Sequence, residues 1–193
     1  MKNGSCWNID VEKHIELNIK KGMNVFDIGS YIGMHVDTIM KAIQYGKLIC
    51  IEAQPLVYNI LKRNVNTYHT CEVYNKIISN TSDPRCVNLY EFYNSNPGGN
   101  CTYDFKNNST MCGVETTTLD SFQEIIQVIP NIIKISTNSD NYDVILGMNR
   151  ILKLYKPALY ISRNEDTEKI RNYLFKLNYT HIDIGNNMDF FQS

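Results

Sequence analysis

The sequence lacks long hydrophobic runs and has no excess of charge of either sign. No apolar stretch approaches the ~18 residues that a membrane-spanning helix needs, and residues 1–10 contain no apolar segment typical of a secretory signal. Nineteen basic residues against twenty acidic ones give a net charge of −1, which does not favour binding to a phosphate backbone. The abundance of Asn, Ile, Lys and Tyr indicates an AT-rich genome, cellular or viral. We expect a cytoplasmic protein (in the host cytoplasm if viral), with no membrane partner and without nucleic acid as its expected partner.

The cysteines and histidines also lack a recognisable spacing. None of the six cysteines is paired at Cys-x-x-Cys spacing, and Cys50 lies inside an apolar run that is typical of a buried strand. Without a secretory signal, reduced thiols are favoured over a disulfide framework. The four histidines are scattered singly, so no metal site is predicted.

The chain has the composition of a folded protein. It contains 193 residues, of which 43% are hydrophobic and 20% charged, which is enough to bury a full core. There is no internal repeat, low-complexity linker or shift in composition along the chain. We therefore predict a single domain over residues 1–193.

Apolar residues alternate between strand and helix spacing along most of the chain. Strands are predicted over residues 25–28, 48–51, 73–78, 87–92, 132–135, 158–161, 181–184 and 188–191. Helices are predicted over residues 36–43, 55–65, 120–129, 142–155 and 170–177. Residues 94–100 are rich in turn formers, and residues 101–113 are expected to form a loop or short hairpin. This order predicts an α/β fold with an open, mostly parallel sheet, helices on both faces and an antiparallel last strand.

The most informative motif lies between the first strand and the first predicted helix. It reads Asp27-Ile-Gly29-Ser-Tyr-Ile-Gly33. Gly29 allows a sharp turn, Gly33 allows helix and strand to approach closely, and the helix start offers free N–H groups to a polar ligand. Glu52 follows the second strand, where a carboxylate can accept hydrogen bonds from both ribose hydroxyls of an adenosine cofactor.

The chemistry of this loop favours S-adenosylmethionine over NAD. The spacing differs from the Gly-x-Gly-x-x-Gly pattern that binds pyrophosphate. Asp27 would repel a diphosphate but could pair with a cationic amino group. Ser30 lies in the same loop and is predicted to contribute to the cofactor site, while Tyr31 could flank the cofactor or only cover the sheet edge.

The chain resembles the FkbM family of S-adenosylmethionine-dependent O-methyltransferases from about residue 24 to residue 183. The similar segments are Val25-Phe26-Asp27-Ile28-Gly29, Ile51-Glu52-Ala53-Gln54-Pro55, Ile78-Ser79, Asn96-Pro97-Gly98-Gly99, Thr118-Leu119-Asp120, Ile133-Lys134-Ile135 and Val144-Ile145-Leu146-Gly147. The resemblance implies a class I methyltransferase (Rossmann-like) fold, S-adenosylmethionine as cofactor and methylation of a hydroxyl. It also implies a sugar, a glycan or a small metabolite as acceptor.

One segment departs from the family pattern. Family members usually continue the Ile-Lys-Ile strand as Asp-Val-Glu-Gly-x-Glu, whereas this chain reads Ser136-Thr-Asn138-Ser-Asp140-Asn141. Neutral side chains can still form hydrogen bonds, but they are poor bases at neutral pH. Ser136 is predicted to line the cofactor site.

Lys134 and Asp140 are the candidate catalytic residues. Lys134 shares a strand face with Ser136 and is either a snorkelling side chain or an active-site cation. Asp140 is the only acid left in the altered segment. Both would position the acceptor or its proton in a reaction that depends on proximity more than on a strong base. A degenerate methyltransferase fold acting as a cofactor-binding or interaction module is the alternative, and ribose methylation of RNA is a third, weaker hypothesis.

Overall fold

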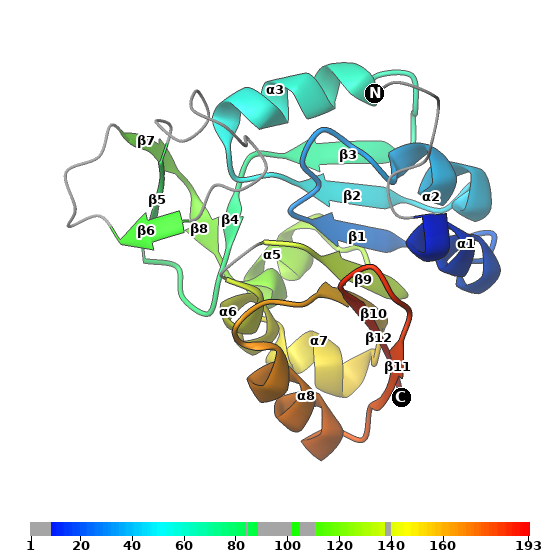
Figure 1. The fold of residues 1–193 in the computed structure, drawn as a ribbon. Helices are drawn as coiled ribbons and strands as arrows, with labels where there is room; N and C mark the ends of the chain where they lie inside the picture. Colours follow the sequence, from blue (N-terminus) through cyan, green and yellow to red (C-terminus); the bar gives the residue numbers. More distant parts are fainter. Residues whose placement is uncertain (1–8, 84, 89–101, 105–110, 138–139) are drawn as a thin grey trace.

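A computed structural model describes residues 9–83, 85–88, 102–104, 111–137 and 140–193. Its centre is a seven-stranded sheet in the order β3-β2-β1-β9-β10-β12-β11 (Figure 1). All neighbouring strands are parallel except β12, which is antiparallel to both β10 and β11. The strands are β1 (Val25–Ile28), β2 (Leu48–Ile51), β3 (Cys71–Tyr74), β9 (Ile132–Ile135), β10 (Ala158–Ser162), β11 (Thr180–Asp183) and β12 (Met188–Gln192). The predicted fold class is therefore confirmed.

Helices cover both faces of the sheet, because alternate residues of the central strands are buried on opposite sides. One face packs against α1 (Ile9–Asn18), α2 (Val36–Ile43) and α3 (Pro55–Asn64). The other packs against α5 (Leu119–Ile126), α6 (Asn141–Leu146), α7 (Asn149–Leu154) and α8 (Thr167–Lys176). In β1, Val25 belongs to the first core and Phe26 to the second, so the two-residue period of the strand separates them.

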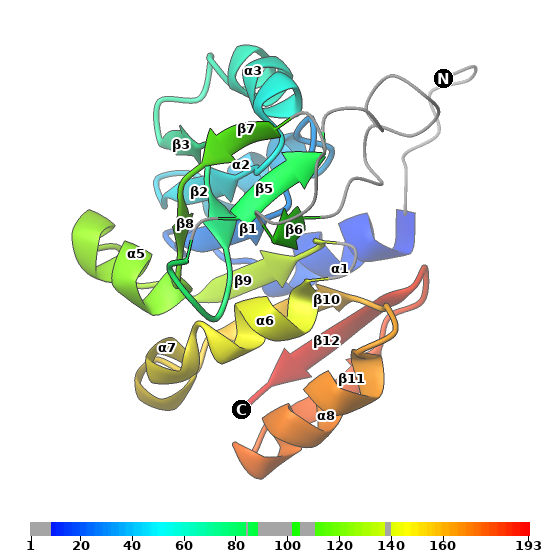
Figure 2. The same cartoon turned by 90° about the vertical axis from the view of Figure 1, so that its left-hand side faces the viewer.

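Two small sheets lie beyond the carboxyl ends of β1, β2 and β3 (Figures 1 and 2). The parallel pair consists of β4 (Ile77–Ile78) and β8 (Thr116–Thr117). The antiparallel sheet has the order β6-β5-β7, formed by β6 (Thr102–Asp104), β5 (Arg85–Asn88) and β7 (Met111–Val114). The small sheets therefore stand at the sheet edge where ligands of open α/β folds bind.

Two predicted elements are each divided in the structure. The predicted strand 73–78 splits into β3 and β4, because the Asn75 side chain donates to the carbonyls of Glu52 and Ala53 at 2.8 and 2.9 Å and draws the chain out of the main sheet. The predicted helix 142–155 splits into α6 and α7. The Asp120 carboxylate accepts the N–H groups of Arg150 and Ile151 at 2.8 and 2.9 Å, which satisfies the start of a new helix.

Other differences concern the ends and the middle of the chain. Helix α1 was not predicted; it buries Val11 and Ile15, and its Glu12 pairs with His35 at the start of α2. Within the predicted loop or hairpin 101–113, β6 and β7 each pair with β5 and not with each other. The predicted turn 94–100 and residues 89–92 of the predicted strand 87–92 lie outside the described residues. In the part that is described, no helix is both long enough and apolar enough to cross a membrane.

Candidate cofactor and acceptor site

The loop after β1 is held between the ends of β2 and β9. The N–H groups of Gly29 and Ser30 donate to the Ile51 carbonyl at 2.9 and 3.2 Å. Gly29 has a φ of +75°, and a Cβ at this position would lie 2.2 Å from the Ser136 carbonyl oxygen. Only glycine fits both the conformation and the space. The tight turn predicted for Gly29 is therefore present, and Ser136 forms one of its walls.

The rest of the loop is also tightly constrained. Gly33 has a φ of +90° and faces Leu61 of α3, where an added Cβ would lie 3.1 Å from the Leu61 side chain. Tyr31 has a φ of +53°, which is uncommon for a residue other than glycine and is often found at functional sites. The Ser30 hydroxyl is buried and donates to the Asp27 carbonyl at 2.6 Å. The Ser30 side chain thus serves the turn itself.

Glu52 connects this loop to the start of α3. Its Oε2 accepts the Tyr31 N–H at 2.9 Å, and its Oε1 accepts the Gln54 N–H at 2.9 Å. Burial raises the pKa of the Glu52 carboxyl, although the two backbone hydrogen bonds act in the opposite direction. Each carboxylate oxygen can accept a second hydrogen bond. The acid predicted from the sequence therefore lies beside the glycine loop with acceptor capacity to spare.

Gln54 was not singled out by the sequence reasoning. It is 2% exposed, and its Oε1 accepts the Leu56 N–H at the N-cap of α3. Its Nε2 is buried and has no hydrogen-bond partner among the residues that the structure describes. A buried amide donor beside Glu52 fits a site that takes a polar ligand. Its position directly before Pro55 was the available signal, because Pro favours the first turn of a helix.

Asp27 and Lys134 form a buried ion pair. Lys134 Nζ donates to Asp27 Oδ1 at 2.9 Å, and the two residues are 4% and 1% exposed. From the sequence, we expected Asp27 to pair with the cationic amino group of the cofactor. In the structure, Lys134 is the cation that pairs with Asp27. The pairing follows from the register, in which Asp27 of β1 stands opposite Lys134 of β9. A buried charge requires such a partner.

The altered segment after β9 is anchored by an amide. Asn141, the first residue of α6, accepts from the Thr137 N–H and hydroxyl and donates to Ser162 at the end of β10. Ser136 is half-buried, and its N–H donates to the Ile28 carbonyl at 2.9 Å. Asp140, the other candidate catalytic residue, directly precedes α6, and its N–H donates to the Thr137 carbonyl at 3.3 Å. Residues 138–139 lie outside the described residues.

The structure thus brings most of the predicted site residues to one edge of the sheet. Gly29, Glu52, Ser136 and Asp140 all follow the carboxyl ends of β1, β2 or β9. Lys134 lies within β9, one layer deeper, and contacts Asp27. Loop, acid and strand ends together provide a cradle at the end of the sheet where open α/β folds bind ligands.

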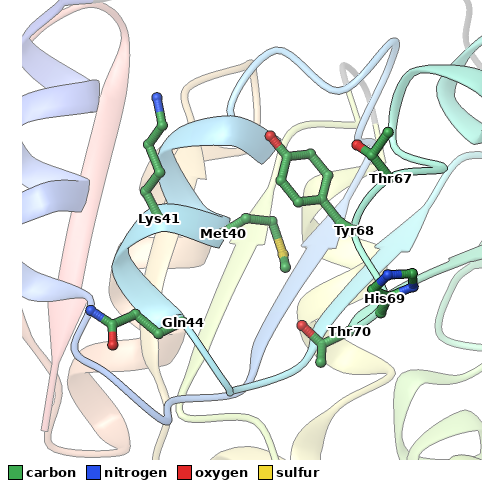
Figure 3. Close-up of a pocket in the computed structure, with 7 residues that line it drawn as sticks. All are labelled: Met40, Lys41, Gln44, Thr67, Tyr68, His69 and Thr70. Carbon is green, nitrogen blue, oxygen red and sulfur yellow. The ribbon is translucent and has the colours of Figure 1, made fainter.

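A shallow pocket of about 340 Å³ lies at the opposite end of the sheet (Figure 3). It is bounded by the C-terminal part of α2 and by residues 67–70, which precede β3. Its lining residues are Met40, Lys41, Gln44, Thr67, Tyr68, His69 and Thr70. Because these residues lie at the amino ends of β2 and β3, the pocket is separate from the candidate site.

The strand order, the reversed last strand and the glycine loop beside Glu52 define a class I methyltransferase fold. The family model of the methyltransferase FkbM domain matches residues 27–180, and the chain belongs to this family. Membership confirms the resemblance noted in the sequence and the expected cofactor of the family, S-adenosylmethionine. A search of curated proteins found no match.

Solved structures agree with the fold. Methyltransferase FkbM from Methylobacillus flagellatus superposes with a TM-score of 0.62 at 15% identity, covering 88% of this chain and 43% of that chain. Precorrin-6y C5,15-methyltransferase from Geobacter metallireducens gives 0.59 at 10% identity, covering 99% and 90%. Fibrillarin from Aeropyrum pernix, in complex with S-adenosyl-L-methionine, gives 0.56 at 9% identity, covering 90% and 66%. At these identities the likeness concerns the fold, and the chain spans less than half of the Methylobacillus flagellatus protein.

Proposed function

We propose that this protein transfers the methyl group of S-adenosylmethionine to a hydroxyl of a sugar, a glycan or a small metabolite. The observation that carries the proposal is the Glu52 carboxylate, which is bonded to the Tyr31 N–H of the glycine loop. This contact places an acid with free acceptor capacity next to a backbone turn that only glycine can form. A ribose with two adjacent hydroxyl donors fits such a carboxylate.

Several residues would contribute to binding the cofactor, each in a different way. Glu52 would accept the ribose hydroxyls, and Gln54 Nε2 would donate to a polar atom of the nucleoside. Gly29 and Gly33 would let the backbone approach the ligand. The bound cofactor supplies an electrophilic methyl group on a sulfonium. Asp27 is held by Lys134, and we assign this pair to support of the loop, with Lys134 acting through Asp27 and not on the acceptor.

The acceptor side of the proposed site would be lined mainly by neutral groups. Ser136 directly follows β9 and Ser162 is the last residue of β10, and both would present neutral hydroxyl groups to the acceptor. Neutral hydrogen-bonding groups match the hydroxyls of a sugar and do not attract a cationic acceptor. Catalysis would then come from holding the acceptor oxygen in line with the methyl carbon. Asp140 is the acid in this segment that would receive or orient the acceptor proton.

Two measurements test the proposal in order. Calorimetric titration with S-adenosylmethionine and S-adenosylhomocysteine tests the cofactor site, and absence of binding would overturn the proposal. Release of S-adenosylhomocysteine is then followed with monosaccharides, oligosaccharides, small hydroxylated metabolites and an RNA oligonucleotide as acceptors. Turnover on a sugar or metabolite hydroxyl is the expected result. Tight cofactor binding without turnover on any acceptor would support a cofactor-binding module, and turnover on RNA alone would support ribose methylation.

A further inference from the structure

Asn141 occupies the junction between the carboxyl ends of β9 and β10. Its side chain is fully buried, and the residue is 0% exposed. Its Oδ1 accepts the Thr137 N–H at 2.9 Å and the Thr137 hydroxyl at 2.9 Å. Its Nδ2 donates to the Ser162 carbonyl at 2.7 Å and to the Ser162 hydroxyl at 3.2 Å. Both ends of the amide are therefore engaged.

This arrangement requires an amide and excludes a carboxylate. The Ser162 carbonyl is only an acceptor, so the group that faces it must donate. A carboxylate of the same shape would place one acceptor against another in a buried setting, which is costly. At position 141, where the resemblance implies an acid in the family, this chain therefore has a residue to which the neighbouring groups are complementary.

The hydrogen bonds of Asn141 connect to the glycine loop after β1, here called the cofactor loop. Thr137, which Asn141 holds, follows Ser136, whose N–H donates to the Ile28 carbonyl at 2.9 Å. The Ser136 carbonyl lies against Gly29 so closely that a Cβ there would be 2.2 Å away. A shift of Thr137 would therefore move one wall of the turn that precedes the cofactor site. Tightly packed groups of this kind transmit small displacements.

We propose that Asn141 is a positioning residue that sets the geometry of the cofactor loop through Thr137 and Ser136. The inference rests on the proposed cofactor site, and it adds a residue to that site which the ligand need not touch. It also assigns a role to the amide that replaces the family's acid. The role requires a hydrogen-bond donor facing Ser162, so it depends on the protonation state of any carboxyl placed at position 141.

The test compares Asn141→Asp with Asn149→Asp in the full chain. Asn149 is a matched control because it is the first residue of α7, as Asn141 is of α6, and its Oδ1 accepts from the Tyr173 hydroxyl. At pH 8 we expect Asn141→Asp to weaken S-adenosylhomocysteine affinity about tenfold relative to the wild type. At pH 5.5 this ratio should shrink, because a protonated Asp can again donate to Ser162. Asn149→Asp should match the wild type at both pH values.

The outcomes separate the two proposals. If the wild type does not bind S-adenosylhomocysteine, the proposed function fails, and this inference fails with it. If the wild type binds and Asn141→Asp binds equally well at pH 8, with the folded fraction checked by circular dichroism, only the positioning role is overturned. A tenfold loss of affinity that does not recover at pH 5.5 would also contradict the positioning role. Such a loss would indicate a steric defect, which does not depend on the protonation of Asp.

A second variant keeps the inference testable if Asn141→Asp does not fold. Thr137→Val keeps the shape of the side chain and the backbone N–H, and it removes only the hydroxyl that donates to Asn141. We expect a loss of S-adenosylhomocysteine affinity of about threefold, since one of four hydrogen bonds of the junction is absent. Unchanged affinity in a folded Thr137→Val protein would contradict the positioning role.

Discussion

Lys134 Nζ lies 2.9 Å from Asp27 Oδ1, and the two residues stand directly opposite each other on neighbouring parallel strands at the centre of the sheet. Both side chains are almost completely buried. Each charge is therefore compensated only if the other is present, because water cannot reach either of them. The pair lies at the end of β1, one residue before the strand passes into the glycine loop.

Removal of one member of this pair should be far more damaging than removal of both. We expect Lys134→Met to lower the free energy of unfolding by about 3–5 kcal/mol, because Asp27 would keep an uncompensated buried charge. Adding Asp27→Asn to this variant should restore part of the loss. Urea unfolding of the single and double variants measures the difference. Lys41→Met, which removes an exposed partner of Asp37, is the control and should change the stability little.

Lys134→Met and Asp27→Asn each change the free energy of unfolding. If these two changes simply add in the double variant, the ion pair is not the reason for burial of Lys134. In that case Lys134 would again be a candidate for a cation that acts on the acceptor. Cofactor affinity of the double variant provides a second readout. It should fall less than that of Lys134→Met if the pair only supports the loop.

Gly29 and Gly113 offer a matched pair for testing the loop. Gly29 has a φ of +75°, and the Ser136 carbonyl occupies the space that a side chain would need, whereas no atom of the described residues lies within 4 Å of a Cβ built on Gly113. We expect Gly29→Val to abolish S-adenosylhomocysteine binding and Gly113→Val to leave it intact. Calorimetry on proteins whose fold has been checked by circular dichroism decides the matter. Normal binding by folded Gly29→Val would show that the loop is only structural.

Glu52 should contribute strongly to cofactor affinity. Glu52→Ala removes the carboxylate beside Tyr31 and should weaken binding of S-adenosylmethionine by about 2–3 kcal/mol, the cost of losing charged hydrogen bonds. Glu72→Ala is a suitable control, because Glu72 lies on the neighbouring strand β3 and pairs with Lys47. Isothermal titration calorimetry gives both values. Equal affinity of the wild type and Glu52→Ala would place the cofactor elsewhere.

The raised pKa of Glu52 predicts a pH dependence with a defined sign. Burial is its main cause. A carboxyl whose pKa is higher in the folded protein than in the unfolded chain favours folding below its ordinary value of 4.5, and this contribution is lost as pH rises through the folded pKa. In the absence of cofactor, the stability of the wild type relative to Glu52→Gln should therefore fall as pH rises from 4 to 8. Urea unfolding of both proteins across this range tests the sign, and a constant or rising difference would contradict it.

Most of the main sheet could be predicted because its strands and helices differ clearly in apolar spacing. The run Leu48–Ile51 is buried throughout, and Val36–Ile43 has one apolar stripe, so each element had a single interpretation. The failures came from side chains that act at a distance in sequence. Asn75 ends β3 by binding carbonyls more than twenty residues earlier, and Asp120 starts α7 thirty residues later. Neither partner can be identified from local periodicity.

The site was predictable where backbone geometry dictated the residue type. Gly29 and Glu52 could be singled out as candidates because a tight turn after one strand and an acid directly after the next strand have a recognisable spacing. The partner of Lys134 could not be predicted without the strand register. This register places β9 beside β1, although the two strands are far apart in the chain. Asn141 was noticed only as a missing acid. Its function depends on the Ser162 carbonyl, and backbone groups carry no signature in the sequence.

Restoring the family's acids distinguishes a specialised enzyme from a decayed one. Ser136→Asp combined with Asn138→Glu re-creates two of the carboxylates, and Ser136→Asn combined with Asn138→Gln is the uncharged control of matched shape. We expect the acidic variant to lower S-adenosylhomocysteine release, because Ser136 directly adjoins the cofactor loop and the junction at Asn141 is already complementary without charge. The uncharged control should retain more activity than the acidic variant. Activity that appears only in the acidic variant, from an inactive wild type, would instead identify a fold that binds cofactor after its catalytic acids were lost.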